Sequence, residues 1–329
     1  MLKRLKHFYA TEKSKWEITK AYKNDSHEYW RWQYNNPKVK TKNALEARIL
    51  RQTHVIEKGM SLSHPREKFG VQKASELLDD ITFFCENGFS IEDSIAVRNA
   101  LGVIKAYLEF HKERGFVPED VVKKFQEFKS FIPEGAEPFG INNITKEELQ
   151  IKVHCEYPEF LRSRHSVRQF DDREVKLEDI QKAVSLAMNA PSACNRQSVK
   201  VYCYTDKMTN NALGKLIAGN TGFEQEVPLY LVLTSDISSF HDAFERNQTY
   251  VDGGIFCMAL IEALHYYGMA SCVLQNGEYK ERNLQFKEIC GNIPSNEKIV
   301  LFVAVGYYKD DIIYATSHRK AIEDVLVIK

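Results

Sequence analysis

A short segment near the middle of the chain concentrates side chains that can bind phosphate. It reads SRHSVRQF (163–170) and holds Arg164 and Arg168, with His165 and Ser166 between them. An arginine guanidinium is a planar, permanently charged fork that pairs with phosphate oxygens, and a serine hydroxyl adds a further donor. The alternative is an ordinary basic turn facing solvent.

Two other segments carry polar side chains of a similar kind. APSACNRQ (190–197) ends a predicted helix, and the amides of Asn195 and Gln197 can each donate and accept, as recognition of a planar carbonyl-and-imide edge requires. ATSHRK (315–320) again places a serine near an arginine, Arg319. Each segment alone is explained as a helix cap or a surface turn, so only their combination and order indicate a site.

The elements that must position these segments fall into two parts. Up to residue 131 the apolar residues recur at helical spacing, and glycines end successive predicted helices. Ser90 is a candidate N-cap for the helix that ends before Gly115. Residues 132–144 are rich in Pro, Gly and Asn and form the best candidate for a linker. We therefore expect a helical N-terminal domain over residues 1–140.

Beyond the linker the pattern changes to alternating strands and helices. Four apolar runs are predicted to be strands, namely SVKVYCYT, LYLVLTSD, ASCVL and KIVLFVAVGYY. This alternation predicts a second domain over residues 145–329, in which helices cover a sheet. The helix predicted over residues 248–268 is apolar on most of its circumference, which is typical of a helix buried in a large core or against a partner subunit.

Composition limits the classes of protein to consider. The chain is 43% hydrophobic and 27% charged with zero net charge, which is ordinary for a soluble globular protein. Its apolar runs are far shorter than the roughly 20 residues of a membrane span, so we expect a cytoplasmic protein without one. The seven cysteines form no CxxC pair and no Cys/His cluster with zinc spacing, so no metal site is predicted.

Positive charge is concentrated in an arm formed by residues 1–42. This arm holds eleven Lys/Arg against four Asp/Glu and includes YWRWQY (29–34). A basic, aromatic arm could contact anionic lipid or nucleic acid, but we favour a solvated helix whose aromatic residues dock on its own domain. Because no recognised nucleic-acid-binding motif accompanies the arm, we expect no nucleic-acid partner and at most peripheral contact with a membrane.

The polar segments, taken in order with the strands between them, resemble the nitroreductase family of FMN-dependent oxidoreductases. The order is RHSVR, APSxxNxQ, an asparagine before EVPLYLVL, then SCVLQN and SHR. The resemblance covers about residues 155–329 and implies an α+β fold. This would be a nitroreductase-like α/β/α sandwich with a central, mainly antiparallel sheet, preceded by the all-helical domain. The sequence departs from the family pattern in lacking a proline after Gln197 and in carrying Gln275 where some members have glutamate.

The resemblance also implies which residues bind FMN, while it implies no general acid or base. Those implied for the phosphate and ribityl chain are Arg164, His165, Ser166, Arg168 and Arg319. Those implied beside the ring, or supporting it, are Pro191, Ser192, Asn195 and Gln197, with Asn220 at the pyrimidine edge. The loop whose backbone would run along the flavin, with the Gln275 amide near N5, is formed by Val273, Leu274, Gln275 and Asn276.

The activity implied is a two-step hydride transfer to a small-molecule substrate. NADH or NADPH would pass hydride to flavin N5 and leave, and an electron-poor acceptor would then take its place, which gives ping-pong kinetics. Family members form intertwined homodimers with FMN at the subunit interface, which would bury the apolar helix over residues 248–268. Two alternatives stay open. One is an FMN-dependent dehydrogenase or oxidase acting on a peptide or sugar intermediate, and the other is a flavin-free scaffold that recruits partners at a membrane surface.

One segment of the helical half carries a resemblance of its own. HVIEKGMSL (54–62) is similar to a segment of nitroreductase-like proteins encoded among bacterial surface-polysaccharide genes. His54 and Glu57 share a helical face, which suits a metal or acid/base role, although we favour an ion pair on the helix surface. Our hypothesis is that the helical domain caps the flavin pocket or docks a carrier-linked substrate.

Overall fold

The computed structural model divides the chain into two compact units. The residues it describes are 2–32, 36–132, 139–153, 155–193, 196–240, 245–276, 280–291, 293–294 and 296–329. The sheet unit comprises Met1–Ser26 and Ile144–Ile312, and the helical unit comprises His27–Asn143 and Ile313–Lys329. The division expected from the sequence, at residues 1–140 and 145–329, stays a prediction.

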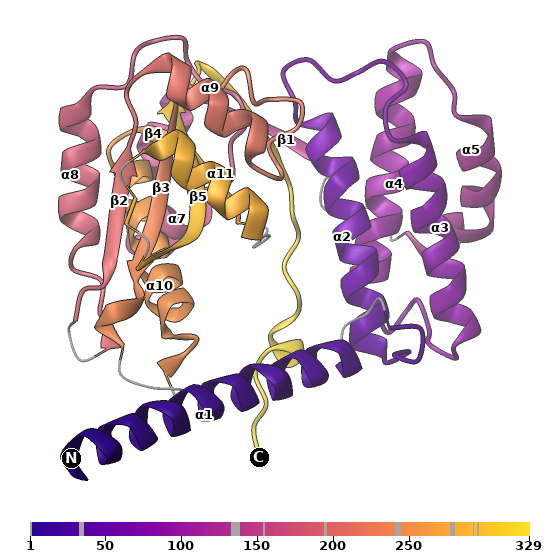
Figure 1. The fold of residues 1–329 in the computed structure, drawn as a ribbon. Coiled ribbons are helices and arrows are strands. Elements are labelled where there is room, and N and C mark those ends of the chain that lie inside the picture. The colour runs from indigo at the N-terminus through magenta and orange to yellow at the C-terminus, as the bar shows by residue number, and fades with distance from the viewer. Residues whose placement is uncertain are drawn as a thin grey trace. The chain divides into compact units, whose positions relative to one another are not determined.

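As far as residue 131, the described part of the helical unit is built from helices. They are α2 (Lys42–Met60), α3 (Val71–Glu86), α4 (Ile95–Glu113), α5 (Glu119–Phe125) and the 3-10 helix η1 (Gln126–Phe131). Helices α2, α3 and α4 lie side by side (Figure 1). Their apolar faces meet in a core that includes the fully buried Ile49, Leu77, Phe84, Leu101 and Tyr107. The helical pattern predicted for this part of the chain is confirmed.

Side-chain caps set where two of these helices begin. The Thr41 hydroxyl accepts a backbone hydrogen bond at the start of α2. The Ser94 hydroxyl accepts from the Val97 N–H at 3.2 Å and opens α4. The predicted cap, Ser90, is wrong, because its hydroxyl donates to the Glu92 carboxylate instead of accepting from the helix.

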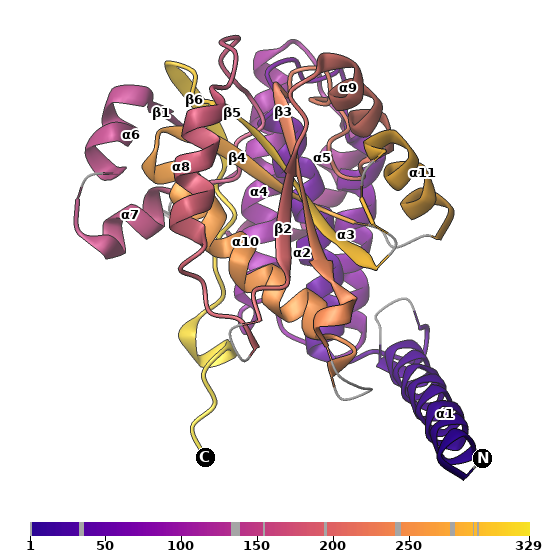
Figure 2. The same cartoon turned by 60° about the vertical axis from the view of Figure 1, so that its left-hand side comes forward.

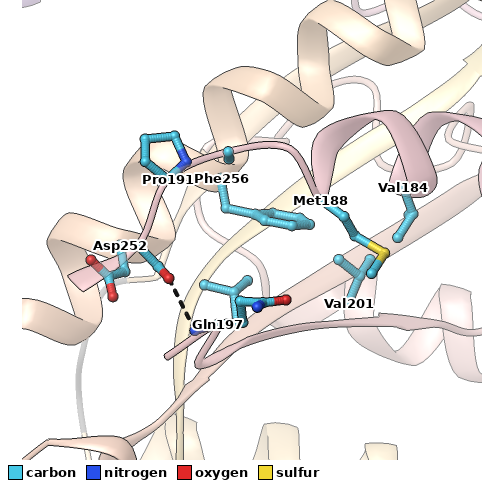
Figure 3. A pocket seen from close by; sticks show the side chains of 10 residues that line it. Val184, Met188, Pro191, Gln197, Val201, Asp252 and Phe256 are labelled. Atoms are coloured by element: carbon cyan, nitrogen blue, oxygen red, sulfur yellow. Dashed lines mark hydrogen bonds between the residues drawn. The ribbon is translucent and has the colours of Figure 1, made fainter. Parts of the chain in front are cut away.

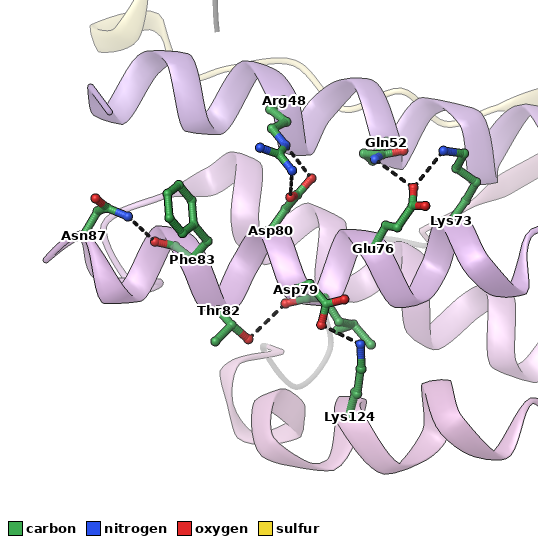
Figure 4. Close-up of polar contacts among 11 residues, drawn as sticks. Arg48, Gln52, Lys73, Glu76, Asp79, Asp80, Thr82, Phe83, Asn87 and Lys124 are labelled. Atoms are coloured by element: carbon green, nitrogen blue, oxygen red, sulfur yellow. Dashed lines mark hydrogen bonds and ion pairs between the residues drawn. The ribbon is translucent and has the colours of Figure 1, made fainter. Parts of the chain in front are cut away.

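Ion pairs join α2, α3 and α5 along their polar faces. Figure 4 shows Arg48 of α2 against Asp80 of α3, with Nη2 and Oδ1 2.6 Å apart, and Lys124 of α5 against Asp79 at 2.5 Å. Burial raises the pKa of Asp80, and the neighbouring Arg48 charge opposes that rise. Partly exposed pairs of this kind contribute at most about 1 kcal/mol each, so the apolar core does most to hold the helices together.

Helix α1 (Leu2–Trp32) covers most of the predicted basic arm. The side chains of Tyr9, Trp16 and Tyr22 are 74%, 62% and 51% exposed. The expectation that the aromatic residues of the arm dock on their own domain is therefore wrong for these three, and the side chains of residues 29–34 lie outside the described part. Among the described residues, no helix has the length and apolar character needed to cross a membrane.

The sheet unit is an α/β/α sandwich, as the sequence predicted. Its strands are β2 (Val199–Cys203), β3 (Leu229–Asp236), β4 (Met269–Gln275) and β5 (Glu297–Tyr307), all paired antiparallel in the order β2-β3-β5-β4. Helices α8 (Leu177–Ala187) and α10 (Gln248–Tyr266) cover one face, and α9 (Lys207–Leu216) and α11 (Lys280–Cys290) lie on the other (Figure 2). Alternate residues of β3 pack on opposite faces of the sheet, since Leu231 packs under α10 while Tyr230 faces α9.

Helix α10 is the apolar helix predicted over residues 248–268. Leu260 and Leu264 are fully buried against the sheet, and Gly253 allows close approach to β5, because a Cβ there would lie 2.8 Å from Val300. On another side of α10, Val251, Ile255 and Met258 are 50%, 40% and 41% exposed. Their i, i+4, i+7 spacing makes this a continuous apolar stripe that the described residues leave partly exposed.

Short elements complete the described structure. They are α6 (Lys146–Val153), α7 (Tyr157–Ser163), η3 (Ile237–Ser239), η5 (Ile322–Asp324) and a two-stranded sheet of β1 (Ile141–Thr145) with β6 (Asp311–Ala315). The linker predicted over residues 132–144 is corrected in part, because β1 begins at Ile141. Residues 133–138 of that linker lie outside the described residues.

Candidate functional site

The arginine-rich segment lies along an edge of the sheet. It follows α7 directly, and Ser166 forms a parallel bridge with Ser271 of the edge strand β4. The Val167 N–H donates to the Ser271 carbonyl at 3.0 Å. Arg164 is half-buried and Ser166 is exposed. The fold therefore places these predicted site residues next to β4, which carries the others predicted to run along the flavin.

Arg168 is a buried cation whose partners are incomplete. Its side chain is 5% exposed, and Nη1 lies 3.5 Å from the Ser166 carbonyl oxygen, the limit for a hydrogen bond. Within the described residues its Nε has no hydrogen-bond partner, and no carboxylate forms an ion pair with it. A buried guanidinium without a counter-charge is costly, so this arrangement suits a bound anion such as a phosphate.

Behind Arg164 lies a buried chain of three hydrogen bonds centred on His265 of α10. Ser163 Oγ donates to the Phe160 carbonyl, so His265 Nε2–H donates to Ser163 Oγ at 2.8 Å. The other ring nitrogen, Nδ1, then accepts from the Tyr308 hydroxyl at 2.8 Å. His265 is fully buried and neutral in this arrangement, and it ties the end of α7 to the body of the sheet unit.

The neutral His265 predicts a pH dependence of stability. Burial, followed by the charges of Arg164 and His165, lowers the pKa of His265 to about 4, whereas a histidine in the unfolded chain titrates near 6.5. Between these values the folded state binds fewer protons than the unfolded state. The free energy of unfolding therefore falls as the pH is lowered from about 6.5 to about 4, by about 3 kcal/mol in all.

The measurement is urea unfolding of His265→Gln and of the unaltered protein, each at neutral pH and near pH 4.5. The variant is less stable at neutral pH and loses this contribution to the pH dependence. His64→Gln, at an exposed residue, is the matched control and keeps the full dependence. If His265→Gln also kept it, the histidine would not be held neutral.

The end of β4 presents a partly exposed edge. Val273 is 39% exposed and Gln275 is exposed, while Leu274 is buried. The Asn276 amide nitrogen donates to the Asn283 side chain and to the Ile299 carbonyl, both at 2.9 Å. Its Oδ1 is buried and has no partner among the described residues, so this end of the strand has an acceptor still to be satisfied.

Asn220 lies close to the same strand and already serves the fold. Its amide nitrogen donates to the Gly214 carbonyl at 2.6 Å and to the Tyr230 hydroxyl at 3.0 Å. A Cβ on the preceding Gly219 would touch the Leu274 side chain at 3.6 Å, so this loop packs against β4. The predicted contact with a pyrimidine edge stays a prediction and would use the Asn220 carbonyl oxygen.

Pro191, Ser192 and Gln197 line a cavity of about 200 Å³ between α8, β2 and α10. In Figure 3 the apolar side chains of Met188 and Phe256 face this cavity. Gln197 has a left-handed backbone (φ 50°), and its N–H donates to Ser192 Oγ at 3.0 Å. Asn195, predicted to lie beside the ring, falls outside the described residues.

Two carboxylates hold the turn that carries these residues. The Ala193 N–H points between both oxygens of Asp252, each 3.2 Å away, and Asp252 is 2% exposed on α10. Arg196 forms two hydrogen bonds with Glu245, at 2.9 and 2.7 Å. Sequence reasoning missed Asp252, although a lone carboxylate in the apolar start of α10 was a usable signal. It also missed His265, for which no local pattern gave a signal.

Among the described residues, a single chain does not bring these two groups of predicted residues together. The turn is bonded to Asp252, whereas the arginine segment is tied to His265, thirteen positions further along α10. That spacing is about 20 Å along a helix. The cavity also opens beside β2, while the arginines lie beside β4 at the opposite edge of the sheet. Arg319 belongs to the helical unit, so its place at a phosphate stays a prediction.

Comparison with known proteins bears on the sheet unit. Residues 161–236, which include the arginine segment and the turn with Ser192, match the Nitroreductase family. The similarity to this family therefore covers the segment that holds the arginines, α8, β2 and β3. An iodotyrosine deiodinase of Haliscomenobacter hydrossis is 25% identical over 219 residues, and the match covers 58% of this chain and 96% of that protein.

Solved structures similar to this chain include one from Streptococcus pneumoniae and one from Clostridium difficile. A nitroreductase family protein from Streptococcus pneumoniae TIGR4 is 20% identical, with 53% of this chain and 100% of that chain covered and a TM-score of 0.44. An FMN-dependent nitroreductase from Clostridium difficile R20291 is 20% identical, with 51% and 96% covered and a TM-score of 0.41.

Proposed function

We propose that the sheet unit binds FMN and acts as an NAD(P)H-dependent oxidoreductase. The observation that carries this proposal is Arg168, a buried cation with an unsatisfied Nε, beside Arg164 and Ser166 at the open edge of β4. A phosphate would supply the missing charge and acceptors. A flavin-free scaffold has no use for such a cation, which is costly to bury without a counter-ion.

In this proposal the chain's own residues bind, orient and shield the cofactor. Arg164, His165, Ser166 and Arg168 hold the phosphate and ribityl chain, and the backbone from Val273 to Asn276 lies along the ring. Bound FMN would supply the chemistry for hydride transfer between NADH or NADPH and an electron-poor acceptor. The hydrogen-bond chain through His265 fixes the end of α7, and therefore the start of the arginine segment.

We further propose that each site is completed by a second copy of the chain. The turn with Pro191, Ser192 and Gln197 lies about 20 Å along α10 from the residues that anchor the arginine segment. A homodimer in which each copy offers this turn to the other's arginines would join the two groups. The exposed apolar stripe of α10, Val251 with Ile255 and Met258, gives such a homodimer a surface to bury.

The first experiment is an absorbance spectrum of the purified protein, before and after anaerobic addition of NADH or NADPH. We expect flavin absorbance near 450 nm, as is usual for such cofactors, and its bleaching by one of the two nicotinamides. Colour that does not bleach with either, yet bleaches with a peptide or sugar substrate, would favour the dehydrogenase alternative. A colourless protein that takes up no added FMN would refute the proposal.

Once reduction is established, acceptors are compared by steady-state kinetics. Nitroaromatic compounds and quinones represent electron-poor acceptors, and 3-iodotyrosine is included because of the similarity to an iodotyrosine deiodinase. Parallel lines in double-reciprocal plots are the expected sign of the ping-pong scheme. Intersecting lines would show that both substrates are bound at once.

A further inference from the structure

The helical unit has a polar cavity of its own, of about 170 Å³. Three elements enclose it, namely one face of α2, one face of α4 and the segment that carries Ser317 and His318. Leu50 and Val103 give it apolar wall, while His54, Glu57 and Asn99 are polar. All of these residues belong to the helical unit, and none of them is among the residues proposed to bind FMN.

The cavity separates the roles of residues in the HVIEKG segment. Ile56 is 1% exposed and belongs to the apolar core. Gly59 is needed for packing, because a Cβ at that position would overlap the Phe69 ring at 2.2 Å. His54 and Glu57 are the two residues of the segment that line the cavity. The sequence predicted an ion pair between His54 and Glu57 on the helix surface. Glu57 is only 4% exposed, so this residue does not lie on the surface.

The wall opposite α2 is held in an unusual backbone conformation. Ser317 has φ 49°, in the left-handed region that side chains other than glycine rarely adopt. Its N–H lies 3.3 Å from Glu57 Oε1 and its hydroxyl 3.5 Å from Oε2. Such strained residues cluster at ligand sites, where the surrounding structure holds them in place. The strained Ser317 and the buried Glu57 carboxylate are thus in contact where two walls of the cavity meet.

We propose that this cavity binds a small neutral molecule that carries neighbouring hydroxyl groups on a frame about the size of one six-membered ring. An apolar cavity of about 150 Å³ holds benzene, so this volume suits one ring. The buried Glu57 carboxylate accepts hydrogen bonds and repels anions. The Ser317 N–H and hydroxyl already lie against the two Glu57 oxygens, so this carboxylate is stabilised by neutral donors, which suits further neutral donors. Hydroxyl groups donate to Glu57 and also accept from the Asn99 amide.

The test compares three ligands that share one ring and differ in charge. They are trans-1,2-cyclohexanediol, cyclohexylammonium and cyclohexanecarboxylate, each titrated into the full-length protein and followed by ligand-observed NMR. We expect saturable binding of the diol and at least about tenfold weaker binding of both ions. Tighter binding of either ion, or no saturable binding of the diol, would overturn the proposal.

Matched variants locate the binding. Val103→Phe fills the cavity from α4, and we expect it to abolish diol binding. Val55→Phe makes the same change on α2 at a residue that is 42% exposed and outside the cavity lining, and it leaves binding intact. Glu57→Gln weakens binding about tenfold through loss of a charge-assisted hydrogen bond. If Val103→Phe fails to fold, as shown by circular dichroism, Asn99→Leu replaces it. Binding that survives the cavity variant places the diol elsewhere and overturns the assignment.

Discussion

Replacing Arg168 with methionine weakens FMN binding by about a hundredfold, or roughly 3 kcal/mol, because it removes charge-assisted hydrogen bonds to a phosphate. Methionine keeps much of the apolar bulk of the arginine stem. The FMN dissociation constant is measured by quenching of flavin fluorescence as the apoprotein is titrated. A second arginine, Arg173, gives a matched control, since its side chain is 57% exposed and paired with Asp171. Arg173→Met leaves the dissociation constant unchanged.

The same variant has an opposite effect on the protein without cofactor. Arg168 is buried, and its Nε has no partner among the described residues, so the folded apoprotein bears the cost of desolvating this charge. We expect Arg168→Met to unfold at the same temperature as the unaltered apoprotein or a higher one. A large loss of apoprotein stability would mean that Arg168 serves the fold, and weaker FMN binding would then not report on a phosphate contact.

The sequence was most informative where the signal was local. Helical spacing predicted α2, α3 and α4, and apolar runs predicted all four strands of the main sheet. Ser90 and Ser94 show the limit of such signals, because serine is a good N-cap residue and both lie near the start of the predicted helix. The choice follows from long-range packing, since the Ser94 hydroxyl also donates to Glu46 at 2.6 Å, 48 residues away. The strands β1 and β6 have five residues each and were not predicted.

The candidate site shows the same contrast between local sequence signals and long-range contacts. Arg164 and Arg168 stand out in sequence because charged residues at close spacing are a local feature. The support behind them, from Ser163 through His265 to Tyr308, joins residues 102 and 43 positions apart, and no local pattern marks it. The separation of the two predicted halves of the flavin site is also invisible in sequence, because it depends on the strand order β2-β3-β5-β4.

That separation gives the prediction with the sharpest outcome, which concerns dimers built from two different variants. One chain carries Arg168→Met, and the other carries Ser192→Asp, whose carboxylate still accepts from the Gln197 N–H but places a charge where the ring is proposed to lie. Each homodimer is expected to be inactive. If the arginines of one copy work with the turn of the other, a heterodimer has one site with both defects and one intact site.

Heterodimers purified through two different affinity tags should therefore show about half the NAD(P)H oxidation rate of the unaltered dimer, by the symmetry of a twofold assembly. If each site were built within one chain, both chains of the heterodimer would be defective and its rate would be near zero. Sedimentation of the unaltered protein as a monomer would contradict the shared site before any rate is measured. Recovery of activity requires both a dimer and an exchange of the turn between copies, because neither alone rebuilds an intact site.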